Sequence, residues 1–476
     1  MRINTGVGCV LAVTFALLCV PFASAGPSAA AAPPAGYVVD FVATAASGFD
    51  MNDGGDVVGR SYPDPGCGSN CLPSEDSVVW KGGLRIVLPE VPGLSPIFAT
   101  AINAQGWVTG FVGVPGTTTH AVVWKPVGST VHNRYVAVDL GNLPGKTISY
   151  AVGIDDLGRV VGWSTTANFP PDGSPFMWTE AGGMVDLSAQ GFPDDKPMAI
   201  SPGGTVATVD FWYRLGDPGS VTSMPPAPRG FVIGADASAI NDAGDQARFL
   251  ITTGGENLLY LFRFHHEGTW QQISPIPTGH LSRAGIGSIT DAGDITATVG
   301  GAGVIAYGPD GLAESLDALV SAAYAGSVLT DSGPMNASGQ ILAQMIIGQS
   351  GRRLVRLVPG EPCTTNCVKV TKIEMIGKGP EYCDQGDAQA WARLTVTDEA
   401  GTPLSGVRIT SHFFDDYWLD QIVVGKTNAA GQITFKHVGP ACVGAIAILV
   451  TDAATKPGRT FDRTTGILTN YVIPLP

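Results

Sequence analysis

The stretch that decides the fold reads Ala101-Ile102-Asn103-Ala104-Gln105-Gly106-Trp107-Val108-Thr109-Gly110. In it an apolar residue precedes a turn-former, a Gly follows three positions later, and a short apolar strand comes next. Asn, Asp, Ser or Thr opens a turn by bonding nearby backbone, and the Gly takes the positive φ that ends a type I turn with a bulge. The stretch therefore predicts a β-hairpin that turns at Asn103 to Gly106.

The same frame occurs seven times along the chain. Each copy has Ile or Met before the turn and Gly three residues after the first turn position. The first positions of the seven turns are Asn52, Asn103, Asp155, Ser201, Asn241, Thr290 and Asn336. With 63 Gly in 476 residues, composition alone does not place a Gly in all seven copies. The spacings of 51, 52, 46, 40, 49 and 46 residues indicate one repeated unit.

Each repeat has room for four strands. A second hairpin usually follows the first, and its leading strand often ends in an aromatic residue, as at Trp80, Trp124 and Trp178. Small residues such as Gly110 stand where a neighbouring backbone would come close. Four short antiparallel strands in a repeat of this length fit one blade of a β-propeller.

The ends of the repeat region also fit a closed ring. The last repeat shows three strands, finishing at residues 353–358, and the segment 37–42 before the first turn can supply the fourth. We therefore predict an all-β chain with a seven-bladed β-propeller over residues 36–360. An open β-solenoid of stacked hairpins is the alternative. The pattern is weakest in the fourth copy, where Pro202 and the Pro-rich residues 225–228 interrupt it.

Residues 361–476 lack the repeat and have the strand rhythm of an immunoglobulin-like β-sandwich. The predicted strands cover residues 368–375, 388–398, 407–414, 420–427, 432–438, 445–451 and 469–473. Turn sequences separate them, such as Glu399-Ala400-Gly401 and Asn428-Ala429-Ala430-Gly431. The repeat stops at residues 359–363, and the linker Thr364-Thr365-Asn366 inside the Cys-x3-Cys loop is expected to mark a domain boundary.

The N-terminus predicts export. Arg2 precedes an apolar run over residues 7–22, and Ala23-Ser24-Ala25 has the small-x-small pattern of a cleavage site, so residues 1–25 are predicted to be a signal peptide. The run is shorter than a spanning helix, and no second such run follows, so no membrane span is expected. The mature protein is expected to be extracellular, either secreted or associated with the cell surface.

Six cysteines follow the predicted cleavage site: Cys67, Cys71, Cys363, Cys367, Cys383 and Cys442. An even number in an exported chain favours disulfides. The two Cys-x3-Cys pairs can close small loops, which leaves Cys383 and Cys442 to pair across the second domain. A four-thiolate zinc site is the alternative. No metal and no cofactor is predicted.

The repeat resembles one found in bacterial extracellular proteins and named for its His-Ala-Phe tripeptide, the HAF repeat. Its first half is matched by Ala101-Ile102-Asn103 through Gly110, and its second half is altered, with His120-Ala121-Val122-Val123-Trp124 as the nearest copy of the tripeptide. The resemblance covers residues 36–360 and implies an exported β-repeat protein without implying an activity. Residues 396–407 and 427–431 resemble bacterial immunoglobulin-like domains of adhesins and cell-surface enzymes.

The composition argues against nucleic acid as a partner. Charged residues make up 14% of the chain and the formal net charge is −14, so the surface repels a phosphate backbone. The Asp-rich turns lack the ligand spacing of calcium loops. The adjacent His265 and His266 point to opposite faces of a strand, which does not suit a metal site.

The densest group of polar and aromatic residues lies at positions 412–420. Carboxylates beside aromatic rings can bind a sugar or a cation. The candidate ligand-contact residues are His412, Asp415, Asp416, Tyr417 and Trp418. The alternative interpretation is a hairpin tip in which the two Asp form the turn and the aromatic side chains belong to the core.

No catalytic centre can be identified in the sequence, and the catalytic residues of any activity stay unknown. The preferred hypothesis is a secreted or cell-surface binding protein of the adhesion type, with a glycan or a cell-surface protein as its partner. A secreted carbohydrate-active enzyme, a polysaccharide lyase or glycoside hydrolase with its site on loops of several blades, is the first alternative. A structural protein of an extracellular matrix is the second.

Overall fold

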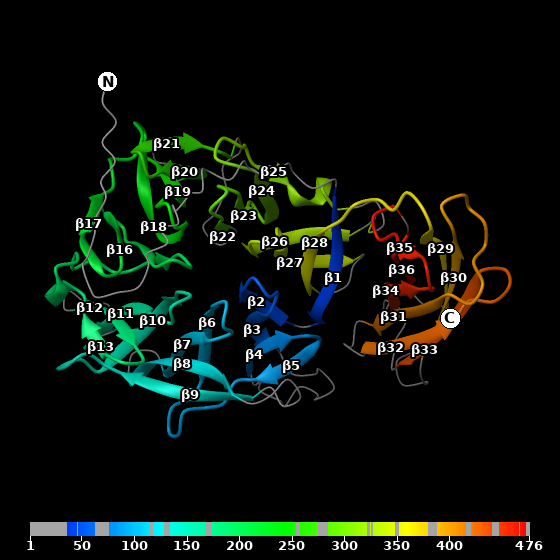
Figure 1. The fold of residues 1–476 in the computed structure, drawn as a ribbon, viewed down its shortest axis with the longest axis horizontal. Coiled ribbons are helices and arrows are strands. Elements are labelled where there is room, and N and C mark those ends of the chain that lie inside the picture. Colours follow the sequence, from blue (N-terminus) through cyan, green and yellow to red (C-terminus); the bar gives the residue numbers. More distant parts are fainter. Residues whose placement is uncertain are drawn as a thin grey trace, which may run out of the picture.

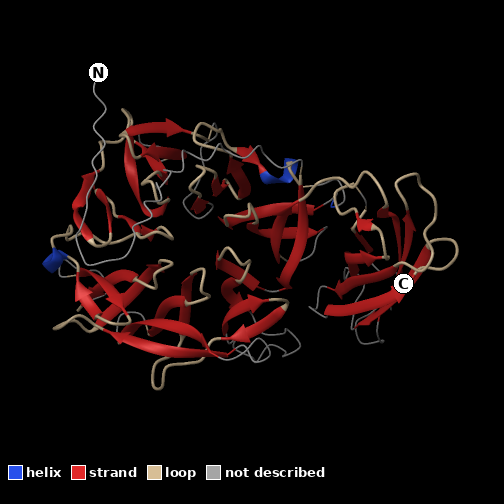
Figure 2. Ribbon diagram, viewed as in Figure 1, coloured by secondary structure: helices blue, strands red, loops and turns tan. Residues whose placement is uncertain are grey.

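The computed structural model describes residues 36–44, 46–61, 76–114, 118–127, 134–166, 173–253, 258–274, 284–320, 324, 327–347, 352–378, 388–415, 420–439, 447–465 and 467–472. This part of the chain is all-β (Figure 2), which confirms the predicted class. Its single turns of 3-10 helix include η1 (Ser188–Gln190) and η3 (Leu316–Ala318). Within these ranges no helix has the length and apolarity needed to cross a membrane.

Strands β1 to β28 form antiparallel units of four strands. The first three units are β2 (Ala46–Met51), β3 (Val57–Ser61), β4 (Asp76–Lys81) and β5 (Leu84–Val87); β6 (Ile97–Ile102), β7 (Val108–Gly113), β8 (Thr119–Val127) and β9 (Arg134–Gly141); and β10 (Ile148–Ile154), β11 (Val160–Thr165), β12 (Ser174–Thr179) and β13 (Gly183–Asp186). A single parallel pair, Ile148 with Thr119, joins the second unit to the third.

The fourth to sixth units are β14 (Ala199–Ile200), β15 (Thr205–Ala207), β16 (Phe211–Arg214) and β17 (Asp217–Ser223); β18 (Phe231–Ile240), β19 (Gln246–Thr252), β20 (Leu259–His265) and β21 (Thr269–Gln272); and β22 (Gly285–Ile289), β23 (Ile295–Val299), β24 (Ala302–Ala306) and β25 (Glu314–Ser315). The fourth unit keeps its four strands, but its first two are short, which agrees with the weak pattern of that copy.

The seventh unit joins the two ends of the repeat region. It consists of β26 (Ser327–Met335), β27 (Ile341–Ile347), β28 (Arg353–Pro359) and β1 (Tyr37–Thr44). Strand β1 pairs with β28 from Tyr37 opposite Pro359 to Thr44 opposite Arg353, which confirms that the N-terminal segment completes the last sheet. The first strand of every unit contacts the first strand of the next, β26 contacts β2, and the units form a ring (Figure 1).

All seven turns have the predicted geometry. The glycines have φ between 73° and 101°, and the backbone N–H of each first position donates to the carbonyl four residues on at 2.8–3.1 Å. In every copy the first side chain also accepts from the backbone N–H of the fifth residue, as in Trp107 to Asn103 Oδ1 at 2.9 Å. The choice of Asn, Asp, Ser or Thr therefore follows from a hydrogen bond within the turn.

The Asn side chains also connect neighbouring units. Asn52 Nδ2 donates to the carbonyl of Asn103 at 3.0 Å, and Asn103 Nδ2 donates to that of Asp155 at 2.9 Å. Asn241 reaches Thr290 at 3.0 Å in the same way. Asn336 of the last unit donates to Asn52 of the first at 3.1 Å. The turns of all units therefore lie on one face of the ring, which we call the turn face.

The hydrophobic cores of the ring lie between units. Val58 and Val79 of the first unit share one buried cluster with Val108 and Trp124 of the second. The third-strand aromatics are core residues, as the pattern indicates, because Trp80, Trp124 and Trp178 are all buried. Full burial of one Val or Leu contributes about 1.5–3 kcal/mol, so each unit is stabilised mainly by its neighbours.

The remaining strands form two four-stranded sheets, which we call the C-terminal module. One sheet has β33 (Gln432–Gly439), β30 (Ala388–Thr397), β29 (Cys367–Lys378) and β35 (Thr460–Phe461), and the other has β32 (Asp420–Lys426), β31 (Arg408–Asp415), β34 (Ala447–Thr455) and β36 (Thr469–Val472). The seven predicted strands are confirmed within a few residues, and only the two-residue β35 was not predicted.

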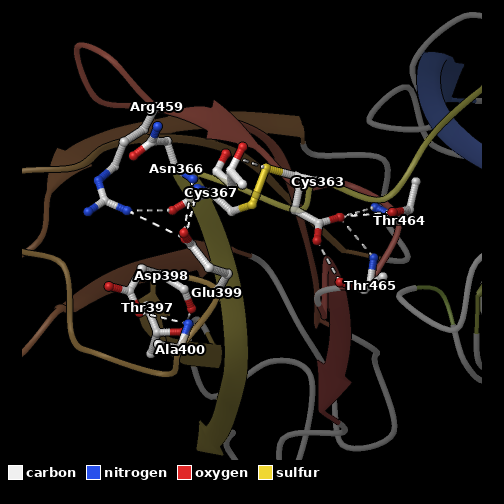
Figure 3. The surroundings of a disulfide bond; sticks show 12 residues. Cys363, Asn366, Cys367, Thr397, Asp398, Glu399, Ala400, Arg459, Thr464 and Thr465 are labelled. Carbon is white, nitrogen blue, oxygen red and sulfur yellow. Dashed lines mark hydrogen bonds and ion pairs between the residues drawn. A yellow bond between two sulfur atoms is a disulfide. The ribbon is translucent and has the colours of Figure 1, made fainter.

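One predicted disulfide is present. Cys363 and Cys367 are bonded, with their Cα atoms 5.8 Å apart, and Figure 3 shows the bond at the start of β29. Glu399 fixes the same loop by accepting from the backbone N–H groups of Asn366 and Cys367, both at 2.9 Å. The other four candidates, Cys67, Cys71, Cys383 and Cys442, lie outside the described residues.

Candidate functional site

The first two strands of most units pair in one common register. In five units the residue five positions before the first turn residue pairs with the residue eight positions after it: Ser47 with Arg60, Phe98 with Phe111, Tyr150 with Trp163, Gly285 with Thr298, and Asp331 with Gln344. A β-bulge separates each pair from its turn. These pairs therefore gather on the face of the ring opposite the turn face.

In the first three units a Gly on the second strand lets the bulged first strand come close to it. A Cβ on Gly110 would lie 2.0 Å from the carbonyl oxygen of Phe98, and Gly59 and Gly162 face the same restriction at 2.1 Å. No side chain fits at such a distance. The predicted close backbone approach after Val108-Thr109 is confirmed, and it is the bulged first strand that makes it.

Five side chains from three consecutive units form a continuous array, which we call the aromatic arc: Phe49, Arg60, Phe98, Phe111 and Tyr150. The Arg60 guanidinium lies 5.8 Å from the Phe49 ring centroid and 5.0 Å from that of Phe98. Phe98 stacks on Phe111 at 4.8 Å, and Phe111 meets the edge of Tyr150 at 5.0 Å. Cation–π and ring–ring contacts thus hold the whole array together.

The aromatic arc is accessible along its length. Phe49 is 41% exposed, and Arg60, Phe98, Phe111 and Tyr150 are each partly exposed. Because each ring is held by the next, the exposed ring surfaces have fixed orientations and a ligand would not have to order them. Flat apolar surfaces with a few polar groups suit a ligand that is itself partly apolar and partly hydroxylated.

The arc continues toward Trp163, which pairs with Tyr150. A Cβ on Gly173 would lie 2.1 Å from the Trp163 indole, so the backbone of Gly173 lies directly on that ring. The segments that follow the second strands of these three units, residues 62–75, 115–117 and 167–172, are outside the described residues.

The turn face carries carboxylates instead of aromatic rings. Asp53, Asp156, Asp242 and Asp291 each accept a hydrogen bond from a backbone N–H of the preceding unit, at 2.7–2.9 Å. Burial raises the pKa of Asp156, and the neighbouring carboxylates raise it further. The pKa of Asp291 is raised by the same two causes. These carboxylates therefore connect neighbouring turns through hydrogen bonds to the backbone.

His265 and His266 stand at the end of β20 and just beyond it. His266 lies against Asp245, with Nδ1 2.7 Å from the carboxylate, and this pair joins two turns of the fifth unit. No group of three or more His, Cys, Asp or Glu side chains suited to a metal ion occurs among the residues that the structure describes.

The ligand-contact residues predicted at positions 412–418 are only partly described. His412 is half-buried on β31, with Nε2 3.5 Å from the Asp452 carboxylate. Asp415 is the last residue of β31 and pairs with Ala447. Asp416, Tyr417 and Trp418 lie outside the described residues, so the proposed cluster stays a prediction.

The aromatic arc was not predicted. A signal was present, because Phe98 and Tyr150 stand at the same position before their turns, and Phe111 and Trp163 at the same position after theirs. Recognising it requires knowing that a bulge precedes this register and that the rings of one unit meet those of the next. Neither fact can be read from a single hairpin.

Comparison with known proteins places the chain in no family. No family model matches it, and no curated protein matches it. Among solved structures, the extracellular domain of a hybrid two-component system of B. thetaiotaomicron aligns at 9% identity and a TM-score of 0.28, covering 90% of this chain and 69% of that one.

Two further solved structures are glycoside hydrolases. An exo-β-1,3-galactanase of Phanerochaete chrysosporium aligns at 9% identity and a TM-score of 0.27, covering 74% of this chain and 91% of that one. An engineered GH43 glycoside hydrolase with endo-xylanase and exo-arabinofuranosidase activities aligns at 9% identity and a TM-score of 0.22, covering 92% and 89%. At such scores neither a shared fold nor an activity follows for this chain.

Proposed function

We propose that this protein is an exported glycan-binding protein and that the aromatic arc is its binding surface. The observation that carries the proposal is the uninterrupted contact from Phe49 through Arg60, Phe98 and Phe111 to Tyr150 across three units. The C–H faces of a sugar ring pack on aromatic faces, while its hydroxyl groups remain free to bond polar neighbours and water. A row of rings therefore suits a ligand made of successive sugar units.

The proposal includes the architecture that the sequence predicts. We take the ring as a seven-bladed propeller over residues 36–360 and the C-terminal module, residues 361–476, as an immunoglobulin-like sandwich. The closed set of contacts between first strands and the turn-to-turn bonds support the propeller. The HAF-type repeat and the signal peptide over residues 1–25 belong to the same proposal, and the bonded Cys363 and Cys367 support export.

The composition of the arc favours binding over turnover. Its five members are four aromatic side chains and one guanidinium group. General acid–base chemistry on a glycoside needs two carboxyl groups about the bond that breaks, and no member of the arc supplies one. Recognition without chemistry is what these side chains can perform.

The test uses mature protein, Gly26 to Pro476, with Phe49→Ala and Tyr150→Ala, which remove the two ends of the arc. Retention on a panel of immobilised polysaccharides is measured together with newly released reducing or unsaturated ends. We expect the parent to be retained without product, and each variant to bind about tenfold more weakly, as the loss of one well-placed ring contact predicts.

Tyr260→Ala is the matched control, because Tyr260 is a partly exposed aromatic residue of the fifth unit that contacts Phe231 edge-on at 5.7 Å. It should bind like the parent. Thermal unfolding midpoints are measured alongside to test whether each variant is folded. Product release by the parent would support the enzyme hypothesis, and equal retention of all variants would place the ligand elsewhere.

A further inference from the structure

The ring has a seam where its two ends meet. Strand β1 is the outermost strand of the seventh unit and is held to β28 by backbone pairing. In Figure 1 it stands between the ring and the C-terminal module. In addition to this pairing, Tyr324 Oη donates to the carbonyl of Val39 at 3.0 Å, and Gly360 N donates to the carbonyl of Gly36 at 2.9 Å.

One arginine of the C-terminal module reaches this seam. Arg463 Nη2 lies 2.6 Å from Asp40 Oδ1 and donates to the carbonyl of Val39 at 2.7 Å. Only 24% of the Arg463 side chain and 29% of that of Asp40 are exposed, so water screens this pair less than it screens a surface pair. The contact binds the module to the side chain and the backbone of β1 together.

The loop that carries Arg463 is rigidly built. Asp462 Oδ1 accepts from Thr464 N at 3.0 Å and Thr464 Oγ1 at 2.9 Å, and Asp462 Oδ2 accepts from Thr465 Oγ1 at 2.6 Å. Asp462 N in turn donates to the carbonyl of Val368 on β29 at 2.8 Å. Because its neighbours are fixed, Arg463 loses little freedom when it binds the seam.

The same carboxylate continues the connection into the ring. Asp40 stands opposite Arg356 in the β1–β28 register, with Arg356 Nη2 3.4 Å from Asp40 Oδ2. Arg356 Nη1 donates to the carbonyl of Gly55, in the turn of the first unit, at 2.9 Å. The buried cluster of the module is also continuous with that of the seventh unit and includes Tyr37 and Val39.

From this chain of contacts we infer that the C-terminal module is a clasp that keeps the ring closed, with Arg463 as the residue that engages β1. The sequence predicts a separate domain over residues 361–476. The contacts instead make the module part of ring closure, because the closing strand is bonded to β28 along one edge and to Arg463 through Asp40 and Val39. This inference does not depend on glycan binding.

The test is amide hydrogen exchange, followed by mass spectrometry, on the full mature chain and its Arg463→Gln variant. Exchange is compared for residues 37–44 of the seam, residues 174–179 of the third unit and residues 390–396 of the module. We expect the seam to exchange about tenfold faster or more in the variant, as loss of a charge-assisted contact predicts. The other two segments should be unchanged.

Asp40→Asn removes the charge pairs with Arg463 and Arg356 from the side of the ring and leaves the module intact, so it must also accelerate exchange at residues 37–44, at least as much as Arg463→Gln does. Arg352→Gln is the control, because Arg352 forms an exposed pair with Asp331 in the same sheet at 3.2 Å. It should leave the seam as in the parent. Seam exchange that is unchanged in either Arg463→Gln or Asp40→Asn would overturn the clasp.

Discussion

At the scale of single residues, Asn at the first turn position differs in function from Asp or Thr. Its carbonyl oxygen accepts from the fifth residue of its own turn, as the side chains of the other turns also do. Its amide group adds a donor that reaches the next unit, as Asn103 reaches Asp155. An Asn therefore joins two units, whereas an Asp such as Asp155 shapes one turn.

Asn103→Asp should separate the two roles. The carboxylate keeps the acceptor for Trp107 N but loses the donor to the Asp155 carbonyl, which is buried and would remain without that partner. We expect a loss of about 1–3 kcal/mol in the free energy of unfolding, measured by denaturant titration. The matched control is Asn428→Asp in the C-terminal module.

Asn428 occupies a turn of the same kind, where its Oδ1 accepts from Ala430 N at 2.9 Å and Gln432 N at 3.0 Å. The side chain is exposed, so a carboxylate there stays hydrated. Stability should change by less than about 0.5 kcal/mol. If both substitutions have the same effect, the bond between units contributes nothing to the ring.

Gly110→Ala tests the close backbone approach beside the aromatic arc. The added Cβ would stand 2.0 Å from the Phe98 carbonyl oxygen, and only a backbone shift can relieve that contact. We expect a lower thermal midpoint and a loss of about 1–3 kcal/mol. Gly285→Ala is the control, because a Cβ there meets no atom within 4 Å. A Gly110→Ala midpoint equal to that of Gly285→Ala would contradict the prediction.

At the scale of strands and units, what could be predicted was local. A turn such as 103–106 is decided by its own Asn and Gly, and the strands on either side follow from their alternation. The aromatic arc depends on a bulge and on packing between units, which adjacent residues do not encode. In the fourth unit the local pattern is weaker than the structure it forms, because β14 and β15 pair even though Pro202 interrupts their sequence pattern.

The Asp50 carboxyl group, which contacts the second unit, should make the stability of the protein depend on pH. Its carboxylate accepts from Met51 N at 2.8 Å and, across the unit boundary, from Ile102 N at 2.9 Å. Burial raises the pKa of Asp50 from 3.8 to about 6. The folded state thus holds this proton more tightly than the unfolded chain does. Its contribution to stability is full below about pH 4 and is lost as the pH rises through 6.

Asp50→Asn should remove this dependence. We expect the unfolding free energy of the variant, relative to the parent, to increase by about 1–3 kcal/mol between pH 4 and pH 7, measured by denaturant titration at each pH. Asp156 and Asp291 have pKa values raised in the same direction, so part of the pH dependence should remain. A difference between variant and parent that stays constant with pH would contradict the prediction.

At the scale of the whole molecule, the two faces of the ring have different chemistry. The turn face is joined by carboxylates such as Asp156 and Asp291. The opposite face carries the aromatic arc on the first three units, whereas the equivalent pairs in the sixth and seventh units are Gly285 with Thr298 and Asp331 with Gln344. The repeat can be predicted from the sequence. The difference between aromatic and non-aromatic pairs is seen when the positions that the structure makes equivalent are compared between units.

The pairing of β1 with β28 also determines the order in which the molecule can be completed. Asp40 is synthesised early, and its partner Arg356 follows 316 residues later. Until then β1 has no neighbouring strand, and its backbone groups form an open edge on which another chain could assemble. Contacts of such sequence separation form slowly. The segment that is synthesised early is therefore the one whose pairing is completed last, and slow closure, more than the stability of any one unit, sets the time during which the open edge is exposed to aggregation.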